Sequence, residues 1–378
     1  STLQKKKKKK VWQRPKVLDS YVPIFMDEAR QAVAQMASNE DLAPVMRRFV
    51  LNSIGRIVYA DRFLDQDAQV NGKLIPEQLV VLISGLGMLF PYPVERSTED
   101  GLLDAPTAPP EVREPWLAAA KVAREFNEKM IAERREQLAA GQDVDRTDLL
   151  TQLLKSDLGD HHVAGLAVEA FSAGLDTTNC STKLLLYELG SNPGVYARLC
   201  EQVLAVCGSD VAGNVTPQQL ARMPYLSATV QEAFRRWPAI AGTGTRNLAR
   251  DVVVYGENDE EVLLPKGTFV SVNTFGLQTD NKHHENSEQF CPERHLAEPP
   301  TGCPHSNPKA FSLFGAGSRA CIGQKLARLE MMSLLVKICQ AYQGIEWAGA
   351  NSPPNCMDAF TLEITDPLLF RLVPRHPN

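Results

Sequence analysis

Cys321 stands where a protein chain can stabilise a thiolate. It follows the glycine-punctuated stretch Phe314-Gly-Ala-Gly-Ser-Arg-Ala, and an amphipathic helical pattern over Gln324–Tyr342 begins shortly after it. Backbone N–H groups and the helix dipole at a helix N-terminus stabilise negative charge on sulfur. A thiolate in such a position can ligate haem iron. The alternative is an ordinary buried thiol, which needs none of the surrounding loop.

The neighbours of Cys321 have the chemistry to seat a flat, negatively charged ligand. Phe314 can cover one flank of the sulfur, and Arg319 can meet a propionate as a charge-assisted pair. Gly317 and Gly323 carry no side chain, so the backbone can approach a porphyrin there. Together these residue types favour a haem site over an inert thiol.

Two upstream segments carry charges that can pair. Glu232 and Arg235 lie three residues apart, so on a helix they share one face. Such a pair is weak evidence by itself, because most surface ion pairs contribute little energy. Arg294 follows within the segment Phe290–His295.

A third segment, Ala173–Thr178, lies inside the long helical stretch Val163–Ser191, but several of its residue types are unfavourable in a helix. Gly174 loses backbone entropy in a helix, and Asp176 and Thr177 compete for backbone hydrogen bonds. Such a conflict is typical of a functional site, although an ordinary turn or capping cluster would look the same.

These segments, in this order along the chain, resemble the motifs of the cytochromes P450, and the Cys321 loop matches the cysteine-ligand loop in every consensus position. The resemblance implies a mainly α cytochrome P450 fold, with a long central helix and small β-sheets. It also implies haem b as the cofactor and Cys321 as the only protein ligand of the iron. Glu232, Arg235 and Arg294 would form a buried triad on the proximal side.

The same resemblance gives the segment around Asp176 a role on the distal face of the haem. Ala173 and Gly174 would line the haem, and a widened helical turn would hold water there. Asp176 would be the acid and Thr177 the alcohol of a relay that delivers protons during oxygen activation. The intact pair disfavours a peroxide isomerase of the same fold.

Softer matches point to the mitochondrial group, whose known members hydroxylate sterols, secosteroids and related lipids. They include Met223–Leu226 and the closing stretch Pro367–Pro374. This resemblance implies an intracellular protein, mitochondrial within the cell, with a ferredoxin-like protein or a reductase as electron donor. Ser227 and Gln231 stand where that group carries docking lysines. Residues expected to restore a basic proximal face are Arg236, Lys325 and Arg328.

The chain departs from the family at its start. Ser1–Lys6 resembles the stretch just after a conserved family helix, so the N-terminal β-sheet and the first helices are expected to be missing. The remaining propionate candidates are then Arg246 and Arg319. We expect a single, partial domain over residues 1–378, because the motifs must converge on one cofactor.

Composition agrees with a large enzyme of a reducing compartment. The chain has 378 residues, 44% of them hydrophobic, and a net charge of −5, which gives no indication of a nucleic-acid partner. The eight cysteines show no C-x-x-C pair. No apolar run approaches the ~20 residues that cross a bilayer, so we expect at most peripheral membrane contact in the full-length protein.

Periodicity predicts a helix-dominated chain with short strands late in it. Helices are expected at Val17–Met36, Leu42–Phe63, Pro76–Leu89 and Pro115–Leu138, and a capping box is expected at Thr216. Strands are expected at Val252–Tyr255, Glu261–Leu264, Thr268–Val272, Thr361–Ile364 and Leu368–Val373.

Two functions follow from these expectations. The first is a haem-thiolate monooxygenase that inserts one oxygen atom from O2 into a hydrophobic, sterol- or lipid-like substrate. Its pocket would lie around Phe171, Ala239–Thr245 and Phe360. The second is a truncated, catalytically impaired remnant that acts at most as a haem- or ligand-binding module.

Overall fold

The computed structural model describes most of the chain. The described residues are 14–60, 106–142, 146–242, 244–256, 258–358 and 361–375, with the backbone of short strands at 69–70, 73–74, 95–96 and 103–104. The expected helix at Pro76–Leu89 lies outside them, as do two expected pocket residues, Thr243 and Phe360.

Helices make up most of the described structure. They are α2 (Pro15–Met36), α3 (Ala43–Tyr59), α5 (Pro110–Ala139), α6 (Leu149–Leu154), α7 (Asp160–Ser191), α8 (Pro193–Cys207), α9 (Pro217–Ala221), α10 (Pro224–Arg236), α11 (Thr274–Thr279) and α12 (Gln324–Ala341). Three short 3-10 helices are η1 (Pro292–His295), η2 (Pro308–Ala310) and η3 (Gly317–Arg319). Among the helices of the described residues, none combines the length and the apolar character needed to span a membrane.

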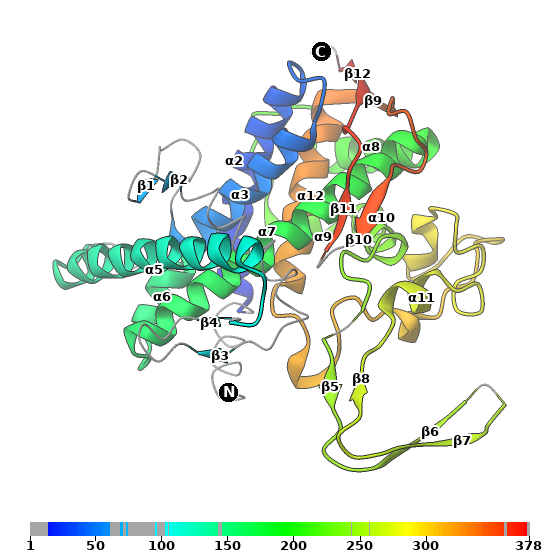
Figure 1. Ribbon diagram of the computed structural model, residues 1–378. Coiled ribbons are helices and arrows are strands. Elements are labelled where there is room, and N and C mark those ends of the chain that lie inside the picture. The colour runs from blue at the N-terminus through cyan, green and yellow to red at the C-terminus, as the bar shows by residue number, and fades with distance from the viewer. Residues whose placement is uncertain are drawn as a thin grey trace.

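The long helix α7 runs through the middle of the molecule, and the other long helices pack around it (Figure 1). Helices α3, α5 and α10 pack on α7, while α2 packs on both α3 and α12. Their apolar side chains merge into one buried cluster that extends from Leu18 on α2 to Leu368 near the C-terminus. This cluster fixes α7, α10 and α12, which carry or adjoin all the motifs of interest.

Local sequence explains where several helices begin. Proline occupies the first turn of α2, α3 and α8, where its missing N–H costs nothing. The predicted capping box of α9 is confirmed. Thr216 Oγ1 accepts a hydrogen bond from Gln219 N–H at 3.2 Å, and Gln219 Oε1 accepts one from Thr216 N–H at 2.9 Å.

The strands of the described structure pair only as two-stranded antiparallel units. Between residues 69 and 104, β1 (Gln69–Val70) pairs with β2 (Lys73–Leu74), and β3 (Glu95–Arg96) with β4 (Leu103–Asp104). Later pairs are β5 (Arg246–Asn247) with β8 (Phe269–Val270), β6 (Val252–Tyr255) with β7 (Glu261–Leu264), β9 (Tyr342–Trp347) with β12 (Phe370–Pro374), and β10 (Cys356–Asp358) with β11 (Leu362–Ile364). The β6–β7 hairpin extends away from the helices (Figure 1).

The expected fold class, mainly α with small β-sheets, is confirmed. Strands β6 and β7 have the predicted bounds, and β8, β11 and β12 fall within or near their predicted ranges. The sequence patterns missed β9, because Tyr342–Trp347 continues directly from α12 and alternates poorly in polarity.

Candidate functional site

The Cys321 loop is an exposed turn held by a backbone hydrogen bond. Cys321 N–H donates to the carbonyl of Phe314 at 2.7 Å, which closes the loop immediately before α12. The Cys321 side chain is exposed, as are residues 315–319. The thiol therefore stands at the start of an 18-residue helix, on an open side of the loop.

Glycine is required in this loop for its backbone angles. Gly315 has φ +64° and Gly317 φ +68°, a region that residues with a Cβ rarely adopt. A Cβ built on Gly317 meets no atom within 4 Å, whereas one on Gly323 would lie 3.8 Å from Cys321 Sγ. Gly323 thus keeps one side of the sulfur open.

Phe314 connects the Cys321 loop to α10. Its ring meets the ring of Phe234 edge to face, with 5.1 Å between the ring centroids. The guanidinium of Arg328, on α12, lies 5.4 Å from the Phe234 centroid and 5.6 Å from the Phe314 centroid. The loop is therefore packed from behind by residues of two helices.

Gln278, on α11, was not predicted from the sequence. Its side chain links the residues just before the Cys321 loop to the end of α10 by hydrogen bonds. Its Oε1 accepts from the backbone N–H groups of Ser312 and Leu313 at 3.1 and 3.0 Å. Its Nε2 donates to the carbonyls of Phe234 and Arg235 at 2.9 and 3.1 Å. Gln278 is fully buried, so these bonds fix the approach to the Cys321 loop against the end of α10.

Glu232, Arg235 and Arg294 meet in a fully buried network. Arg235 donates to both carboxylate oxygens of Glu232, from Nε at 2.8 Å and from NH2 at 2.9 Å. Arg294 Nε donates to Glu232 Oε1 at 3.0 Å. All three side chains are 0% exposed. The bidentate geometry and the second arginine satisfy a charge that burial alone would make costly.

His295 and the backbone of Cys291 complete this network, and the sequence did not predict either. His295 Nε2 lies 2.7 Å from Glu232 Oε2, and Cys291 N–H donates to Glu232 Oε1 at 3.0 Å. Burial by itself would raise the pKa of Glu232, but hydrogen bonds from His295 and Arg235 hold it at about 2. Glu232 is thus ionised at neutral pH, and the segment Phe290–His295 folds around its carboxylate.

The distal motif lies on α7, which stays a continuous helix through it. Thr177 Oγ1 donates to the carbonyl of Ala173 at 2.8 Å, one turn earlier. The expected widened turn is therefore not formed here, because the hydroxyl bonds within an intact turn. Ala173 is exposed although Phe171 and Leu175 beside it are buried, so the face with Ala173 and Thr177 borders open space.

Close packing against α3 explains why a glycine occupies position 174. A Cβ at this position would lie 2.8 Å from Cδ1 of Ile54 on α3. The close approach of α3 and α7 therefore favours a glycine here, since a larger residue would need the Ile54 side chain to shift.

Asp176 is partly buried, and its pKa is raised. Burial is the main cause, opposed by the positive charge of Arg47 on α3 and increased by the negative charge of Glu363 on β11. Lys183, two turns further along α7, also opposes it. Asp176 is thus less ready to lose its proton than an exposed aspartate.

The two propionate candidates are both exposed. Arg246 lies on β5, where its NH1 donates to the carbonyls of Gly244 and Thr245 at 2.6 and 3.1 Å. Arg319 is the last residue of η3, in the Cys321 loop itself. Only Arg319 is close in the chain to the thiol.

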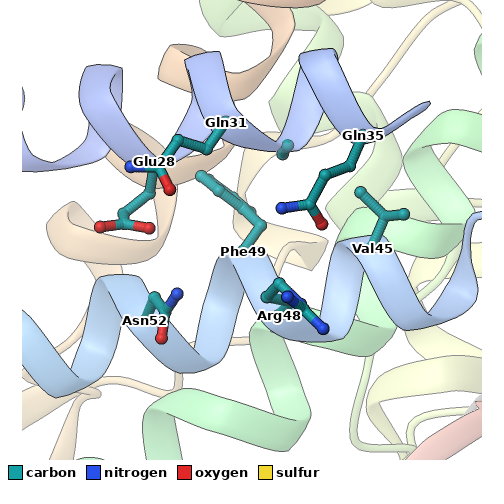
Figure 2. A pocket seen from close by; sticks show the side chains of 8 residues that line it. Glu28, Gln31, Gln35, Val45, Arg48, Phe49 and Asn52 are labelled. Carbon is teal, nitrogen blue, oxygen red and sulfur yellow. The ribbon is translucent and has the colours of Figure 1, made fainter. Parts of the chain in front are cut away.

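The expected place of Phe171 in the substrate pocket was wrong. Phe171 is 0% exposed and packs against Tyr59, at 6.1 Å between ring centroids, so it does not line an open pocket. A small polar pocket lies between α2 and α3, lined by residues such as Glu28, Phe49 and Asn52 (Figure 2). It has room for about one water molecule and does not include the motif residues.

Two of the three cations expected on a basic proximal face are held in contacts with neighbouring side chains. Arg328 is mostly buried, which lowers its pKa to about 10, and it donates to Gln231 Oε1. Arg236 NH2 lies 3.1 Å from Glu288 Oε2, and its Nε faces Glu188 at 3.7 Å. Of the three expected cations, only Lys325 is exposed. Sequence spacing placed these arginines on α10 and α12 but could not show their partners.

These residues fit a haem as the bound group. The exposed thiol of Cys321 is a soft ligand for iron, and the glycine backbone around it presents no side-chain bulk. In the described part of the chain, His, Cys, Asp and Glu side chains form no cluster of three or more that could hold a metal ion. The Cys321 loop therefore fits a haem whose iron is held by the thiolate.

Comparisons with known proteins agree with this geometry. The family model for cytochrome P450 matches residues 3–365. Cytochrome P450 4d2 of Drosophila melanogaster is 28% identical over 87% of this chain and 67% of its own length. The steroid 21-hydroxylase of Sus scrofa is 30% identical over 66% of this chain and 50% of its own length.

A further relative is the mitochondrial 1,25-dihydroxyvitamin D(3) 24-hydroxylase of Mus musculus, 27% identical over 90% of this chain and 63% of its own length. The chain thus spans between half and two thirds of the length of these relatives. The solved structure of retinoic acid bound cyanobacterial CYP120A1 superposes with a TM-score of 0.79 at 22% identity, covering 98% of this chain and 78% of that one. The chain belongs to the cytochrome P450 family.

Proposed function

We propose that the protein is a haem-thiolate monooxygenase that inserts one atom of O2 into a hydrophobic, sterol- or lipid-like molecule. The observation that carries this proposal is the exposed thiol of Cys321 in a glycine loop at the start of α12. Names of relatives support the substrate class, since they include a steroid hydroxylase and a vitamin D hydroxylase.

Cys321 would hold the iron of haem b, with Phe314, Gly317, Gly323 and Arg319 around it. Arg246 would be a second propionate partner. When bound, the haem supplies oxygen activation, which the electron-donating thiolate favours. Ala173 and Gly174 would border its distal face.

On that distal side, Asp176 holds a proton more firmly than an exposed aspartate, because burial raises its pKa. Thr177 lies next to it and presents a hydroxyl whose hydrogen bond to the Ala173 carbonyl can be exchanged for one to a reacting partner. The carboxyl and the hydroxyl then form a two-step path for protons. The substrate only has to pack beside this face and exclude water.

Glu232, Arg235 and Arg294 take no part in this chemistry. Through Gln278 and the Phe234–Phe314 contact, they hold the segment that presents the thiol. An external electron donor, ferredoxin-like or a reductase, would supply electrons from the proximal side. The group resemblance favours an intracellular, mitochondrial setting.

Replacing the thiol tests the proposal. Cys321→Ser should abolish the red-shifted Soret band of the ferrous carbonyl complex, because a serine hydroxyl does not donate electrons as a thiolate does. Cys207→Ser is the matched control, since Cys207 is half-buried at the end of α8. Retention of the shifted band in Cys321→Ser, or its loss in both variants, would contradict the assignment.

A second experiment separates the monooxygenase from an impaired remnant. Haem-loaded protein is screened with sterols and fatty acids for spectral shifts that report displacement of an iron ligand, and binders are then incubated with an electron donor and isotopically labelled O2. The proposal predicts one labelled oxygen atom in the product. Binding without any labelled product would favour the remnant that only binds haem or ligand.

A further inference from the structure

Two half-buried cysteines at the ends of the stretch 291–303 touch each other. Cys291 Sγ and Cys303 Sγ lie 3.9 Å apart, although twelve positions separate them in the chain. Neither belongs to the Cys321 loop, and the proposed function uses neither sulfur. Both side chains retain some exposure to solvent.

The backbone holds each cysteine in place. Cys291 precedes η1, and its N–H donates to the buried carboxylate of Glu232. Cys303 ends a tight turn in which its N–H donates to the carbonyl of Pro300 at 3.0 Å, with Gly302 at φ +82°. A positive φ at the third residue is typical of a type II turn, which glycine suits. The sulfurs therefore meet because two fixed backbone segments bring them together.

We propose that Cys291 and Cys303 form a redox-active dithiol site that a low-molecular-weight disulfide, such as glutathione disulfide, oxidises to a disulfide bond. A disulfide needs about 2.05 Å between its sulfurs, so the two atoms must approach by roughly 2 Å. Rotation of two side chains supplies a movement of that size.

Cys303 is the first nucleophile. Its thiolate attacks one sulfur of glutathione disulfide, breaks the S–S bond and releases one glutathione thiolate, which leaves a mixed disulfide on Cys303. The sulfur of Cys291 then attacks Cys303 Sγ and releases the second glutathione. Two protein thiols are thereby oxidised and one glutathione disulfide is reduced to two thiols, which take up the two protons.

The surroundings of Cys291, including Glu293, determine this order of attack. Cys291 Sγ donates to Glu293 Oε2 at 3.4 Å. Burial, then the neighbouring Cys303 and the Glu293 carboxylate raise the pKa of Cys291 to about 12, so Cys291 is a poor first nucleophile. In the second step, the same carboxylate is placed to accept its proton. Glu293 itself is held by Arg198 at 2.6 Å and by Tyr225 at 3.0 Å.

The bond would close residues 291–303 into a ring that contains Arg294 and His295, both of which contact Glu232. Residues 297–302 of this ring are exposed. Linking its ends restricts the unfolded chain and keeps the exposed part close to the buried network. Oxidation should therefore stabilise the proximal side of the protein.

A second cysteine pair in the chain provides an internal control. Cys200 and Cys339 also lie within hydrogen-bonding contact of each other, but they are 5% and 0% exposed between α8 and α12. A soluble disulfide reaches them only after unfolding. Both pairs therefore have their sulfurs in contact, and they differ in whether a dissolved disulfide can reach them.

The test treats the reduced, haem-loaded chain with glutathione disulfide under native conditions, then blocks remaining thiols and maps the peptides by mass spectrometry. We expect loss of two blockable thiols per chain, a peptide pair linked through Cys291 and Cys303, and release of two glutathione molecules. The oxidised protein should melt at a higher temperature, and dithiothreitol should reverse both changes. The Cys200 and Cys339 thiols should remain blockable only after denaturation.

Cys303→Ser and Cys303→Ala should show no linked peptide and no rise in melting temperature on the same treatment. Glutathione that stays on Cys303 without a link to Cys291 would overturn the proposal. So would a failure of both thiols to react, or equal linking of Cys200 with Cys339.

Discussion

Glu232 and Asp176 are two carboxyl groups withdrawn from solvent, and their surroundings move their pKa values in opposite directions. Burial would raise both. At Glu232, hydrogen bonds from His295 and Arg235 overcome burial and hold the pKa at about 2. At Asp176, burial prevails over the attraction of Arg47, and the pKa is raised. The number of donors that touch the carboxylate decides the sign.

This difference separates the two sides of the proposed haem site. The proximal carboxylate cannot change its charge without disrupting the fold, so it serves as a structural anchor. The distal carboxyl keeps its proton more readily and has no direct cationic partner among the hydrogen bonds described for α7, so it remains available for proton transfer. Withdrawal from solvent thus accompanies a structural role at Glu232 and a chemical role at Asp176.

The largest expected effect comes from removing the proximal anchor. Glu232→Ala leaves Arg235 and Arg294 buried without their counter-charge, which should cost about 3–5 kcal/mol of unfolding free energy. Urea denaturation measures this loss. Glu288→Ala is the control, because Glu288 pairs with Arg236 while 79% exposed, and such pairs contribute at most ~1 kcal/mol. Equal losses in both variants would remove the distinction between the two kinds of carboxylate.

Acid should weaken the proximal side next. Burial, then the charges of Arg235 and Arg294, lower the pKa of His284 from 6.5 to about 4. As pH falls from 6.5 to 4, His284 therefore binds a proton in the unfolded chain but not in the folded chain. Its contribution to the unfolding free energy falls by roughly 3 kcal/mol. Below 4.5, Glu232 adds a further loss that continues towards pH 2.

Between pH 7 and 4, the unfolding free energy of the native chain should therefore fall more steeply with acidification than that of His284→Gln. The adjacent and more exposed His283 gives the matched control, His283→Gln, which should keep the native slope. Equal slopes in the native chain and in His284→Gln would contradict the lowered pKa of His284.

A smaller effect is expected on the distal helix. Gly174→Ala places a methyl group 2.8 Å from Ile54 Cδ1, and overpacking costs about 1–3 kcal/mol, offset by up to ~1 kcal/mol of helix propensity. Adding Ile54→Val, which removes that atom, should recover part of the loss. Gly165→Ala on the same helix meets no atom within 4 Å and should be neutral or stabilising. Destabilisation by Gly165→Ala alone would contradict the packing explanation.

The smallest effect concerns the proximal surface. Ser227 is exposed on α10, and Ser227→Lys should raise the association rate of an acidic ferredoxin at low salt by steering. Gln231→Lys should not, because Gln231 accepts a hydrogen bond from Arg328 and a lysine there would face that cation. Stopped-flow rates at several salt concentrations measure both. An association rate that rises with Gln231→Lys but not with Ser227→Lys would contradict this account of the proximal surface.

Motifs with fixed spacing predicted the buried network around Glu232. Glu232, Arg235 and Arg294 meet as the sequence indicated, because a helix fixes the first pair and the segment Phe290–His295 returns to it. Strands β6 and β7 were predicted to the residue, since β-branched runs and a turn bound them. Such features depend on local chemistry, which a sequence shows directly.

Contacts between distant segments could not be predicted. Gln278 and His295 reach their partners only because of how the chain folds back after α10. Their local sequence does not indicate these contacts. Arg328 was expected on the surface, but its stacking on Phe234 and Phe314 buries it. Phe171 was expected in a pocket because it is apolar and near the motif, a pattern that core residues share.

The division of work between the two carboxyl groups is tested most directly by comparing Glu232→Gln with Asp176→Asn. The measurement is haem per chain, the ferrous carbonyl spectrum and, with any substrate that binds, product formed per electron consumed. We expect Glu232→Gln to lose most of its haem, and Asp176→Asn to keep haem and the shifted band while wasting electrons. Full haem in Glu232→Gln, or unchanged coupling in Asp176→Asn, would contradict this account.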